Sequence, residues 1–453
     1  MEYAAVDRTP TRAYVHTSSG STMSTPAAGE SDRRALSNIS VKLTEETLLE
    51  VLRMFAKRED VCVSGYKVRP AMMSEGDSYQ SSVSRIVLEG SSTSGDVNYS
   101  VSLIVKGLTP NICRRKTFRT VEFFANEIAF YEKAWPKLLA FQEKLKPEHP
   151  FTEIPRCYKT LADGENDFII LEDLAPDGYQ IPPRSEGLDY AHCFKILATL
   201  ARFHALSLAL RDQDPGAFLE VADSVQEIFY KAELKPWYGN LMRDLIDVAL
   251  DAMAKEMPGS IYEEKLCQFT AGDLYCHLAE LVADSREPHG VLSHGDVWTA
   301  NLMCRYEAGG TIPLDTKLVD FQLARCSSPA LDLSMFFYSC TLQDLREKHY
   351  DALVRGYHDT LARSLTELGS RPDVYPLAVL LRELTLYAQY GLGIALEAVP
   401  VSLFDEHDAV CTELQGDQAV PLETVLVVRP IRHREGRMRL CNNVKHMVDC
   451  GYL

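Results

Sequence analysis

Two short stretches in the second half of the chain carry residues whose types and spacing suit chemistry on a hydroxyl group. Residues 293–301, SHGDVWTAN, place four residues between Asp296 and Asn301, and residues 317–322, KLVDFQ, place Asp320 after an apolar run typical of a strand. A carboxylate beside a hydroxyl can orient it and take its proton. Carboxylate and amide oxygens are ligands that Mg²⁺ accepts. We therefore expect Asp296 to activate a hydroxyl beside a Mg²⁺ site formed by Asn301 and Asp320.

The order and spacing of these residues match those used for phosphoryl transfer. Asp296 and Asn301 repeat the kinase catalytic loop, H-R-D-x-x-x-x-N, and Asp320 with Phe321 takes the place of Asp-Phe-Gly. This reaction depends on positioning and charge neutralisation more than on covalent participation. His294 is expected to brace the loop by hydrogen bonds. A lone Asp-x-x-x-x-Asn is most often a solvated turn, but the complete set in this order favours the functional interpretation.

Composition bounds the class of protein. The chain has 453 residues, of which 46% are hydrophobic and 25% are charged, as in ordinary globular proteins with two or three domain-sized units. A net charge of −17 argues against a nucleic-acid or anionic-membrane surface. It leaves ATP open, because Mg²⁺ and a local basic cluster can hold phosphates in an acidic protein.

The cysteines and the apolar runs indicate the compartment. The twelve cysteines form no C-x-x-C pair and are too dilute for a disulfide framework. The N-terminus has no apolar signal region, and no apolar run approaches the length of a membrane span. We expect a cytoplasmic protein with no membrane span.

The N-terminal third predicts a tail followed by a small sheet. Residues 1–35 are rich in Ser, Thr, Ala and Pro and are expected to be disordered, with order beginning near Ile39. Thr44 is a plausible N-cap for a helix over residues 47–56, and residues 61–69, 83–89 and 97–106 read as strands. The turn between the first two strands carries Ser78 and Tyr79 and could lay backbone N–H groups over phosphates. An ordinary hairpin turn fits that segment equally well.

The third strand ends in a lysine that a helix follows. Lys106 matches the kinase strand lysine that contacts the α- and β-phosphates, and residues 114–116 form a basic cluster. Residues 123–139 read as a helix with an apolar face and with Glu127 on it. Glu127 would pair with Lys106, as the equivalent glutamate does in kinases. The alternative is a solvated helix charge.

A strand and a long helix come next. Residues 168–174 read as a buried strand running into a turn, which suits a hinge where the main chain at Glu172 and Leu174 would read the adenine of ATP. The alternative is an ordinary core strand. Residues 190–210 predict a helix whose buried face includes Phe194 and His204, the latter as a hydrogen-bonded core residue rather than a ligand.

The remaining chain reads as mostly helical. Residues 212–288, with breaks at 236–238 and 258–259, are expected to bind the acceptor, although most of them must serve plain packing. Asp332 can hydrogen-bond the catalytic-loop backbone or simply cap its own helix, and the cap is the simpler expectation. Helices are expected over 342–367 and 376–392, with Gly391 and Gly393 breaking the latter.

The order of these segments resembles the small-molecule branch of the protein-kinase-like superfamily, which includes aminoglycoside phosphotransferases and choline kinases. More narrowly, the chain resembles the ecdysteroid kinase-like family, also called CHK-kinase-like, of insects and other invertebrates. The pair His-Gly-Asp-x-Trp and Asp-Phe-Gln is quite specific to that family. The segments that carry the resemblance are 76–79 (GDSY), 84–86 (SRI), Lys106, Phe123 with Glu127 and Tyr131, 171–174 (LEDL), 200–205 (LARFHA), 294–298 (HGDVW) with Asn301, 320–322 (DFQ) and 332–333 (DL).

The resemblance implies an α+β, two-lobed protein-kinase-like fold with a small antiparallel N-lobe over residues 36–172 and a larger, mostly helical C-lobe over 173–453. It implies ATP with Mg²⁺ and phosphorylation of a hydroxyl on a small lipophilic acceptor such as a steroid. Gly295 replaces the Arg of His-Arg-Asp, Gln322 replaces the Gly of Asp-Phe-Gly, and no Ala-Pro-Glu segment follows. These departures argue against protein substrates. The alternative is a non-catalytic kinase-like protein that binds a lipophilic ligand or a partner.

Overall fold

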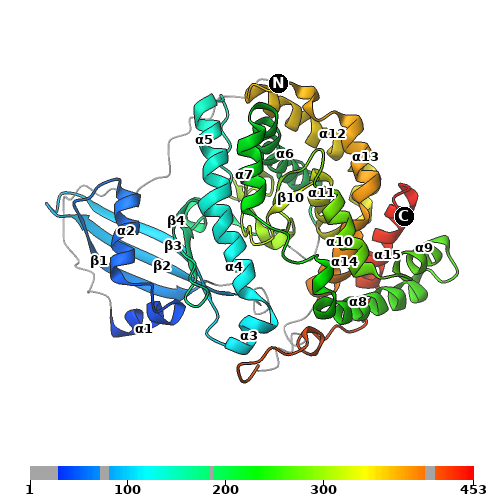
Figure 1. Ribbon diagram of the computed structural model, residues 1–453, viewed down its shortest axis with the longest axis horizontal. Helices are drawn as coiled ribbons and strands as arrows, with labels where there is room; N and C mark the ends of the chain where they lie inside the picture. The colour runs from blue at the N-terminus through cyan, green and yellow to red at the C-terminus, as the bar shows by residue number, and fades with distance from the viewer. Residues whose placement is uncertain (1–28, 72–80, 184–186, 404–413) are drawn as a thin grey trace. The chain divides into compact units, whose positions relative to one another are not determined.

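The computed structural model describes residues 29–71, 81–183, 187–403 and 414–453, and it divides into two compact units (Figure 1). We call the first the sheet unit; its described residues are 29–71, 81–110 and 155–178. The second, the helical unit, holds the described residues of 111–154 and 179–453. Together they form the α+β, two-lobed kinase-like fold that the sequence predicted.

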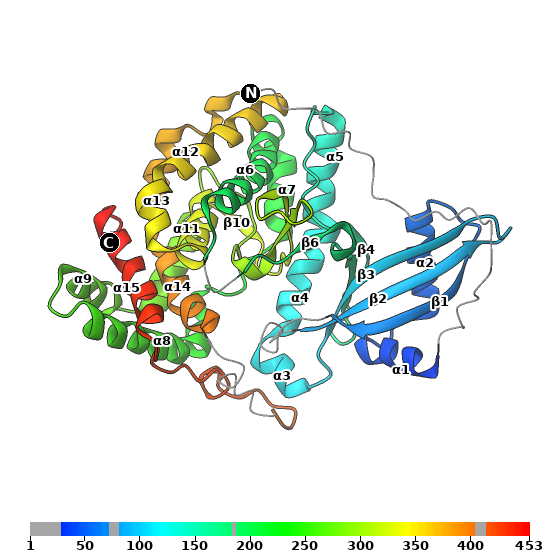
Figure 2. The ribbon, with the colours of Figure 1, turned by 180° about the vertical axis from the view of Figure 1, so that it is seen from behind.

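The sheet unit is a five-stranded antiparallel sheet in the order β1-β2-β3-β5-β4. Helices α1 and α2 cover one face of the sheet (Figure 2). The elements are α1 (Glu30–Ile39), α2 (Glu45–Ala56), β1 (Val61–Pro70), β2 (Ser81–Ser92), β3 (Asn98–Leu108), β4 (Cys157–Leu161) and β5 (Phe168–Glu172). The three strands predicted up to Lys106 are therefore confirmed, and β2, with 12 residues, is clearly longer than the range 83–89 that we expected.

Local sequence explains how these helices meet the sheet. Thr44 caps α2, because its hydroxyl accepts a hydrogen bond from the Thr47 N–H at 3.3 Å. Helix α1 begins at Glu30, so the expectation of a disordered tail through residue 35 is wrong at its end. Leu36 and Ile39 lie three residues apart on α1 and are buried in the core of this unit, which stabilises the helix.

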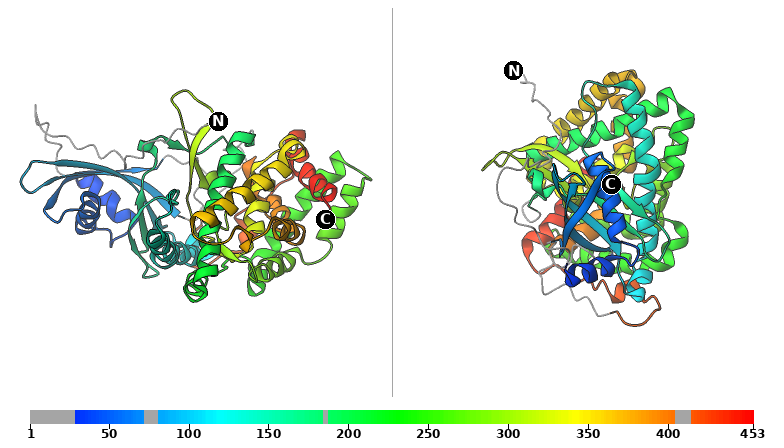
Figure 3. Two further views of the ribbon diagram at one scale, coloured as in Figure 1. Left: turned by 90° about the horizontal axis from the view of Figure 1, so that it is seen from above. Right: turned by 90° about the vertical axis from the view of Figure 1, so that its left-hand side faces the viewer.

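The helical unit holds the remaining elements and two small sheets, of orders β10-β7 and β6-β8-β9. Its helices are α3 (Ile112–Thr117), α4 (Thr120–Ala129), α5 (Trp135–Leu145), α6 (Tyr190–Gln213), α7 (Pro215–Ser224), α8 (Lys235–Glu256), α9 (Ile261–Thr270), α10 (Leu274–Asp284), α11 (Pro329–Cys340), α12 (Gln343–Glu367), α13 (Leu377–Tyr387), α14 (Gln389–Ser402) and α15 (Arg434–Asp449). Its strands are β6 (Tyr179–Gln180), β7 (Val291–Ser293), β8 (Leu302–Tyr306), β9 (Pro313–Leu318) and β10 (Arg325–Ser327). The β8–β9 hairpin can be followed in Figure 3.

Residues 111–154 belong to the helical unit, whereas we expected residues 36–172 to form one continuous lobe. A π-helical turn, Phe130–Ala134, joins α4 to α5 in one helical run. The ring of Phe130 on this run stacks on Phe321 with centroids 3.8 Å apart. Asn126 donates hydrogen bonds to the carbonyls of Gln322 and Ala324 at 3.0 and 2.8 Å. These contacts explain why the run packs with the C-terminal half of the chain.

Long helices follow the predicted pattern, with two corrections. Phe194 on α6 is 42% exposed, so it lies outside the buried face that we assigned to it. Pro236 does not break a helix; it lies in the first turn of α8, where its missing N–H costs nothing. Among the described residues, α6 has the length and apolar composition of a membrane-crossing helix, but 78% of its apolar stretch is buried inside the protein.

Gly391 and Gly393 do not end a helix, contrary to our expectation. Both lie inside α14 and are buried. A Cβ atom at Gly391 would meet the backbone carbonyl of Ser334 at 2.5 Å, and one at Gly393 would meet Leu278 at 2.4 Å. The glycines therefore allow α14 to approach α11 and α10 closely, and packing outweighs their low helix propensity.

Candidate active site

Two strand pairs in the helical unit bring the predicted acidic residues together. Strand β7 pairs with β10, with Ser293 opposite Arg325, and β8 pairs with β9, with Leu302 opposite Leu318. The segment 294–301, which we call the Asp296 loop, and the segment 319–324, the Asp320 loop, therefore connect the same two strand pairs. The N–H of Val319 donates to the carbonyl of Asn301 at 3.1 Å and joins the loops directly.

Asp332 on α11 holds the start of the Asp296 loop. Its Oδ2 accepts from the backbone N–H of His294 at 2.7 Å, and its Oδ1 accepts from the N–H of Gly295 at 2.9 Å. The N-cap of α11 is Ser328, whose hydroxyl accepts from the Ala330 N–H. The expectation that Asp332 simply caps its own helix is therefore wrong, and the loop-binding alternative is correct.

A buried histidine supports this carboxylate. His204 on α6 is fully buried, with Nε2 lying 3.1 Å from Asp332 and Nδ1 lying 2.7 Å from the hydroxyl of Tyr357. Burial alone would raise the pKa of Asp332, but the hydrogen bond from His204 and nearby positive charge lower that pKa below its ordinary value. Asp332 is thus an ionised acceptor for the loop, and the prediction of His204 as a hydrogen-bonded core residue is confirmed.

Gly295 explains why this loop departs from His-Arg-Asp. Its φ of 82° lies in the left-handed region, and a Cβ atom there would meet the carbonyl oxygen of Leu323 at 2.0 Å. Any side chain at this position would collide with the backbone of the Asp320 loop. The close approach of the two loops therefore requires glycine, which the sequence alone did not reveal.

His294 braces both loops, as predicted. Its Nδ1 accepts from the N–H of Asp296 at 3.2 Å, so its Nε2 carries the proton and donates to the carbonyl of Val319 at 2.9 Å. Burial lowers the pKa of His294, against the opposing effect of Asp332, and keeps the ring neutral. A neutral ring with both nitrogens engaged supports the loop backbone and is unsuited to proton transfer.

Asp296 lies against Asn301 within its loop. The side-chain amide of Asn301 donates to Asp296 Oδ2 at 2.8 Å and to the Asp296 carbonyl at 3.0 Å. Burial, aided by the negative charge of Asp320, raises the pKa of Asp296 to about 7, while hydrogen bonds from Asn301 and Gln322 oppose the rise. A carboxylate with this pKa is suited to accept a proton near neutral pH.

Asp320 is held in an uncommon backbone conformation. Its φ is +67°, which a non-glycine residue rarely adopts, and such strain gathers at functional sites. Phe321, the next residue, is fully buried between the stacked ring of Phe130 and the ring of His294, whose centroid lies 4.6 Å away. This buried ring fixes the strained residue before it.

The donor set fits a divalent cation. The negative charges of Asp320 and Asp296 repel each other, and a bound cation would relieve this repulsion. Asn301 uses its amide nitrogen within the loop, and its carbonyl oxygen Oδ1 accepts from no described residue. Asn301 and Asp320 thus offer two oxygen ligands of the kind Mg²⁺ prefers.

Glu127 lies on α4 in the helical unit and is 2% exposed, so the alternative of a solvated helix charge is wrong. Its neighbour Asn126 links three segments: it donates to the Asp320 loop at Gln322 and Ala324 and accepts from the N–H of Gln226 at 2.9 Å. The sequence did not predict this role of Asn126, because an asparagine inside a helix carries no signal for it.

In the sheet unit, Lys106 lies on β3 opposite Val83 of β2 and Ile169 of β5. Val101, Leu103 and Val105 of the same strand are buried in the core, so Lys106 lies on the opposite face. Lys106 and Glu127 belong to different units, and their pairing stays a prediction.

The predicted hinge follows β5. Asp173 is buried and accepts hydrogen bonds at 2.6 Å from both Arg85 Nε and the Ser102 hydroxyl. The N–H of Glu172 donates to the carbonyl of Arg156 at 2.8 Å, whereas the N–H of Leu174 donates to no described residue. Of these two main-chain groups, Leu174 is the one available to a ligand. Ser78 and Tyr79 lie outside the described residues.

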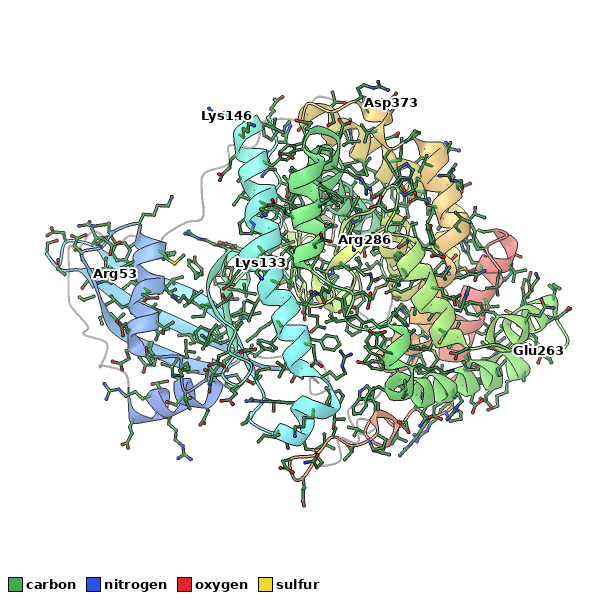
Figure 4. All side chains as sticks on the ribbon, viewed as in Figure 1. Arg53, Lys133, Lys146, Glu263, Arg286 and Asp373 are labelled. Carbon is green, nitrogen blue, oxygen red and sulfur yellow. The ribbon has the colours of Figure 1, made fainter. Side chains whose placement is uncertain are left out.

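Residues 225–275 supply an aromatic cluster in the helical unit. Tyr230 and Tyr238 each pack against Phe229, with ring centroids 4.8 and 4.3 Å away, and both also contact Tyr275. Arg325 is 2% exposed; it donates to Glu227 at 2.9 Å and to the hydroxyl of Tyr390 at 2.7 Å. Beside Glu227 lies an open pocket of about 810 Å³, which Arg286 also lines. The side chain of Arg286 is labelled in Figure 4. The acceptor role predicted for this region stays a prediction.

Comparisons with known proteins place the chain in a family. No curated protein matches it. Among solved structures, it is similar to the GDP complex of aminoglycoside 2′-phosphotransferase-IIIa, at 12% identity and a TM-score of 0.34 over 77% of this chain and 90% of that one. It is also similar to glucosamine kinase in complex with glucosamine, ADP and inorganic phosphate, at 14% identity and a TM-score of 0.29 over 74% and 91%. The model of the ecdysteroid kinase-like family matches residues 75–370, more than half of the chain. The chain therefore belongs to the ecdysteroid kinase-like family.

Proposed function

We propose that this protein is an ATP- and Mg²⁺-dependent kinase that phosphorylates a hydroxyl of a small lipophilic molecule, such as an ecdysteroid, another steroid or a xenobiotic. Membership of the ecdysteroid kinase-like family supports the reaction class. The observation that carries the proposal is the arrangement of Asp296, which lies 2.8 Å from the amide of Asn301 and interacts with the charge of Asp320.

In the proposed reaction, the hydroxyl of the acceptor donates a hydrogen bond to the Asp296 carboxylate. The hydroxyl oxygen then forms a bond to the terminal phosphorus of ATP, while the bond from that phosphorus to the bridging oxygen breaks and ADP leaves. Asp296 takes the hydroxyl proton, which its pKa of about 7 favours. Asn301 keeps the carboxylate oriented during this transfer.

Asn301 and Asp320 would hold Mg²⁺, which supplies charge neutralisation at the phosphates when bound. Asp332 and His294 act through the loop backbone, since they bind main-chain groups of the Asp296 and Asp320 loops. They are positioning residues. The strained φ of Asp320 fits its assignment as a metal ligand held by these positioning residues, because a rigid support is needed to keep a ligand in place.

For ATP, we propose that Lys106 contacts the phosphates and that Glu127 orients Lys106. Ser78 and Tyr79 would cover the phosphates with backbone N–H groups. The main chain at Glu172 and Leu174 would bind the adenine, for which the N–H of Leu174 is available. We also propose a cytoplasmic location, in keeping with the free thiols of all described cysteines.

The test is an assay of purified protein with ATP, Mg²⁺ and a panel of steroid, amino-alcohol and glycoside acceptors. Asp296→Asn should lower kcat by about 10²- to 10⁴-fold, the range for a general base. Asp247→Asn is the matched control, because Asp247 is an exposed carboxylate on α8. Full activity of the Asp296→Asn variant would contradict the assigned role.

A binding measurement separates the kinase from the non-catalytic alternative. A ligand at a hundred times its Kd stabilises a protein by about 2.7 kcal/mol. Saturating ATP with Mg²⁺ should therefore raise the Tm of the wild-type protein. Absence of that rise, together with a rise on adding a lipophilic acceptor, would favour a non-catalytic ligand-binding protein.

A further inference from the structure

One carboxylate near the Asp296 loop has no assigned role. Glu397 lies on α14 and is partly buried, yet it forms no hydrogen bond or ion pair with any residue that the structure describes. Withdrawing a carboxylate from water without a partner is costly, and proteins rarely keep one without a use. A bound molecule that donates a hydrogen bond would satisfy it.

Helix packing places Glu397 on the side of the Asp296 loop. Helix α14 packs on α11, where Gly391 lies against the backbone of Ser334. Towards their C-terminal ends the same two helices are bridged by Arg439, which donates to the Ser339 carbonyl and to the Ser402 hydroxyl. The two helices therefore run in the same direction.

The C-terminal end of α11 in turn contacts the Asp296 loop. The thiol of Cys340 donates to the carbonyl of Val297 at 3.8 Å. Glu397 lies in the C-terminal half of α14, beside this end of α11. Consistent with that placement, Glu397 and Asp296 interact electrostatically.

A cluster of buried aromatic rings lies next to Glu397. Tyr390 and Glu397 are two helical turns apart and share a face of α14. The ring of Tyr390 packs edge-on against Tyr230 at 5.7 Å. Tyr230 is 4% exposed, and its hydroxyl makes no hydrogen bond with a described residue. Both Tyr230 and Tyr238 interact electrostatically with Glu397.

The nearby arginines are already engaged. Arg325 donates to Glu227 and to Tyr390, and Arg119 donates to the carbonyl of Ile228 and to the hydroxyl of Tyr238. Neither guanidinium forms an ion pair with Glu397 among the described residues. Within the described part of the chain, the carboxylate and the Tyr230 hydroxyl thus lack hydrogen-bond partners beside this aromatic cluster.

We propose that Glu397 determines acceptor specificity by binding a second hydroxyl of the acceptor, beside the aromatic cluster that contains Tyr230 and Tyr238. The inference rests on the proposed function and narrows the acceptor to a lipophilic molecule with at least two hydroxyls. Burial disfavours the charged form of Glu397 and raises its pKa, a direction that suits a neutral hydroxyl donor better than an ammonium group.

The experiment compares wild type, Glu397→Gln and Glu397→Ala with a steroid diol and with the mono-ol that keeps only the phosphorylated hydroxyl. A hydrogen bond to a charged group contributes about 1.5–3 kcal/mol, so Glu397→Ala should raise KM for the diol by about 10- to 100-fold. KM for the mono-ol and kcat for both should change little. Glu397→Gln, whose amide oxygen can still accept a hydrogen bond but carries no charge, should raise KM for the diol less than Glu397→Ala does.

The matched control is Glu307→Ala, since Glu307 is an exposed glutamate in the β8–β9 turn. An equal rise in KM for diol and mono-ol would show that Glu397 is merely structural and would overturn the inference. Tight binding of amino-alcohols that Glu397→Gln abolishes would overturn the hydroxyl assignment in favour of a cation site.

Binding without ATP keeps this test separate from the proposed reaction. Calorimetric titration of the diol and the mono-ol into each variant needs no catalysis. If the diol binds wild type more tightly than Glu397→Ala but no phosphate is transferred, the kinase proposal fails and the site remains. If phosphate is transferred and the Glu397 variants bind the diol like wild type, the site fails and the kinase proposal remains.

Discussion

Asp332 on α11 and Gly295 in the Asp296 loop are joined by a hydrogen bond of 2.9 Å from the glycine N–H to the carboxylate. The same carboxylate binds the N–H of His294, and His204 holds it from behind. One ionised group therefore fixes the backbone that carries Asp296. The proposed chemistry depends on this support as much as on the residues that would touch substrate.

Asp332→Ala should lower the free energy of unfolding and abolish activity. Removing one member of a buried, hydrogen-bonded charge network costs about 3–5 kcal/mol, because the two loop N–H groups and His204 lose their partner. Urea denaturation measures the change in the free energy of unfolding. Asp344→Ala is the matched control, an exposed aspartate in the first turn of α12, and should change it by less than about 0.5 kcal/mol.

Asp332 and Asp296 should give opposite dependences of stability on pH. The pKa of Asp332 is lower in the folded protein than in the unfolded chain, so its contribution is present above the unfolded value of about 3.9 and is lost as pH falls. The pKa of Asp296 is raised to about 7, so the folded state binds the extra proton and stability falls as pH rises from about 4 to about 7.

Asp296→Asn should therefore stabilise the protein above neutral pH. At pH 8 we expect the Tm to rise by about 1 °C for each kcal/mol of added stability, the ratio that an unfolding entropy of about 2.1 cal/mol/K per residue gives for a chain of 453 residues. At pH 4 the variant and wild type should melt alike. Calorimetric melting at both pH values measures this, and an equal Tm at pH 8 would show that the carboxylate is not destabilised by its site.

Gly295→Ala should abolish activity through a steric clash. The new Cβ atom would meet the carbonyl oxygen of Leu323 at 2.0 Å and push the two loops apart. Gly259→Ala is the control, because Gly259 also has a positive φ, of 68°, but no atom lies within 4 Å of its Cβ position. We expect a cost of about 1 kcal/mol and normal activity for the control. If both variants lost activity to a similar degree, backbone strain at a positive φ, and not the clash with Leu323, would explain the loss in Gly295→Ala.

Asp320→Asn should weaken the binding of Mg²⁺. An amide keeps one oxygen ligand but loses the negative charge that Mg²⁺ prefers. The Mg²⁺ concentration for half-maximal activity should rise by about tenfold, which corresponds to about 1.4 kcal/mol. Titration of Mg²⁺ at saturating ATP measures it. Acceptor binding should be unaffected. If acceptor binding weakened instead, the assignment of Asp320 as a metal ligand would be contradicted.

The phosphate contact proposed for Lys106 can be tested with Lys106→Met. The variant should raise KM for ATP about tenfold or more, because a charged partner of the phosphates is lost. Lys67→Met is a matched control, as Lys67 is an exposed lysine on β1 of the same sheet. Unchanged KM for ATP in Lys106→Met would contradict the phosphate assignment.

Local sequence determined the family, the predicted roles and most elements. The spacing of Asp296, Asn301 and Asp320 can be read from the order of residues along the chain. The helix cap at Thr44 and the alternation of buried residues in β3 each depend on neighbours only a few residues away. For that reason the helix after Thr44, the strands of the sheet unit and the bracing role of His294 could be predicted.

Tertiary structure decided what depends on distant neighbours. Gly391 reads as a helix break by propensity, yet the approach of α14 to α11 requires it inside a helix. Asp332 could cap its own helix as far as sequence shows, and only the placement of His294 and Gly295 gives it another role. Glu397 carries no sequence signal, because the lack of a partner for a carboxylate is a property of the packed protein and not of the chain.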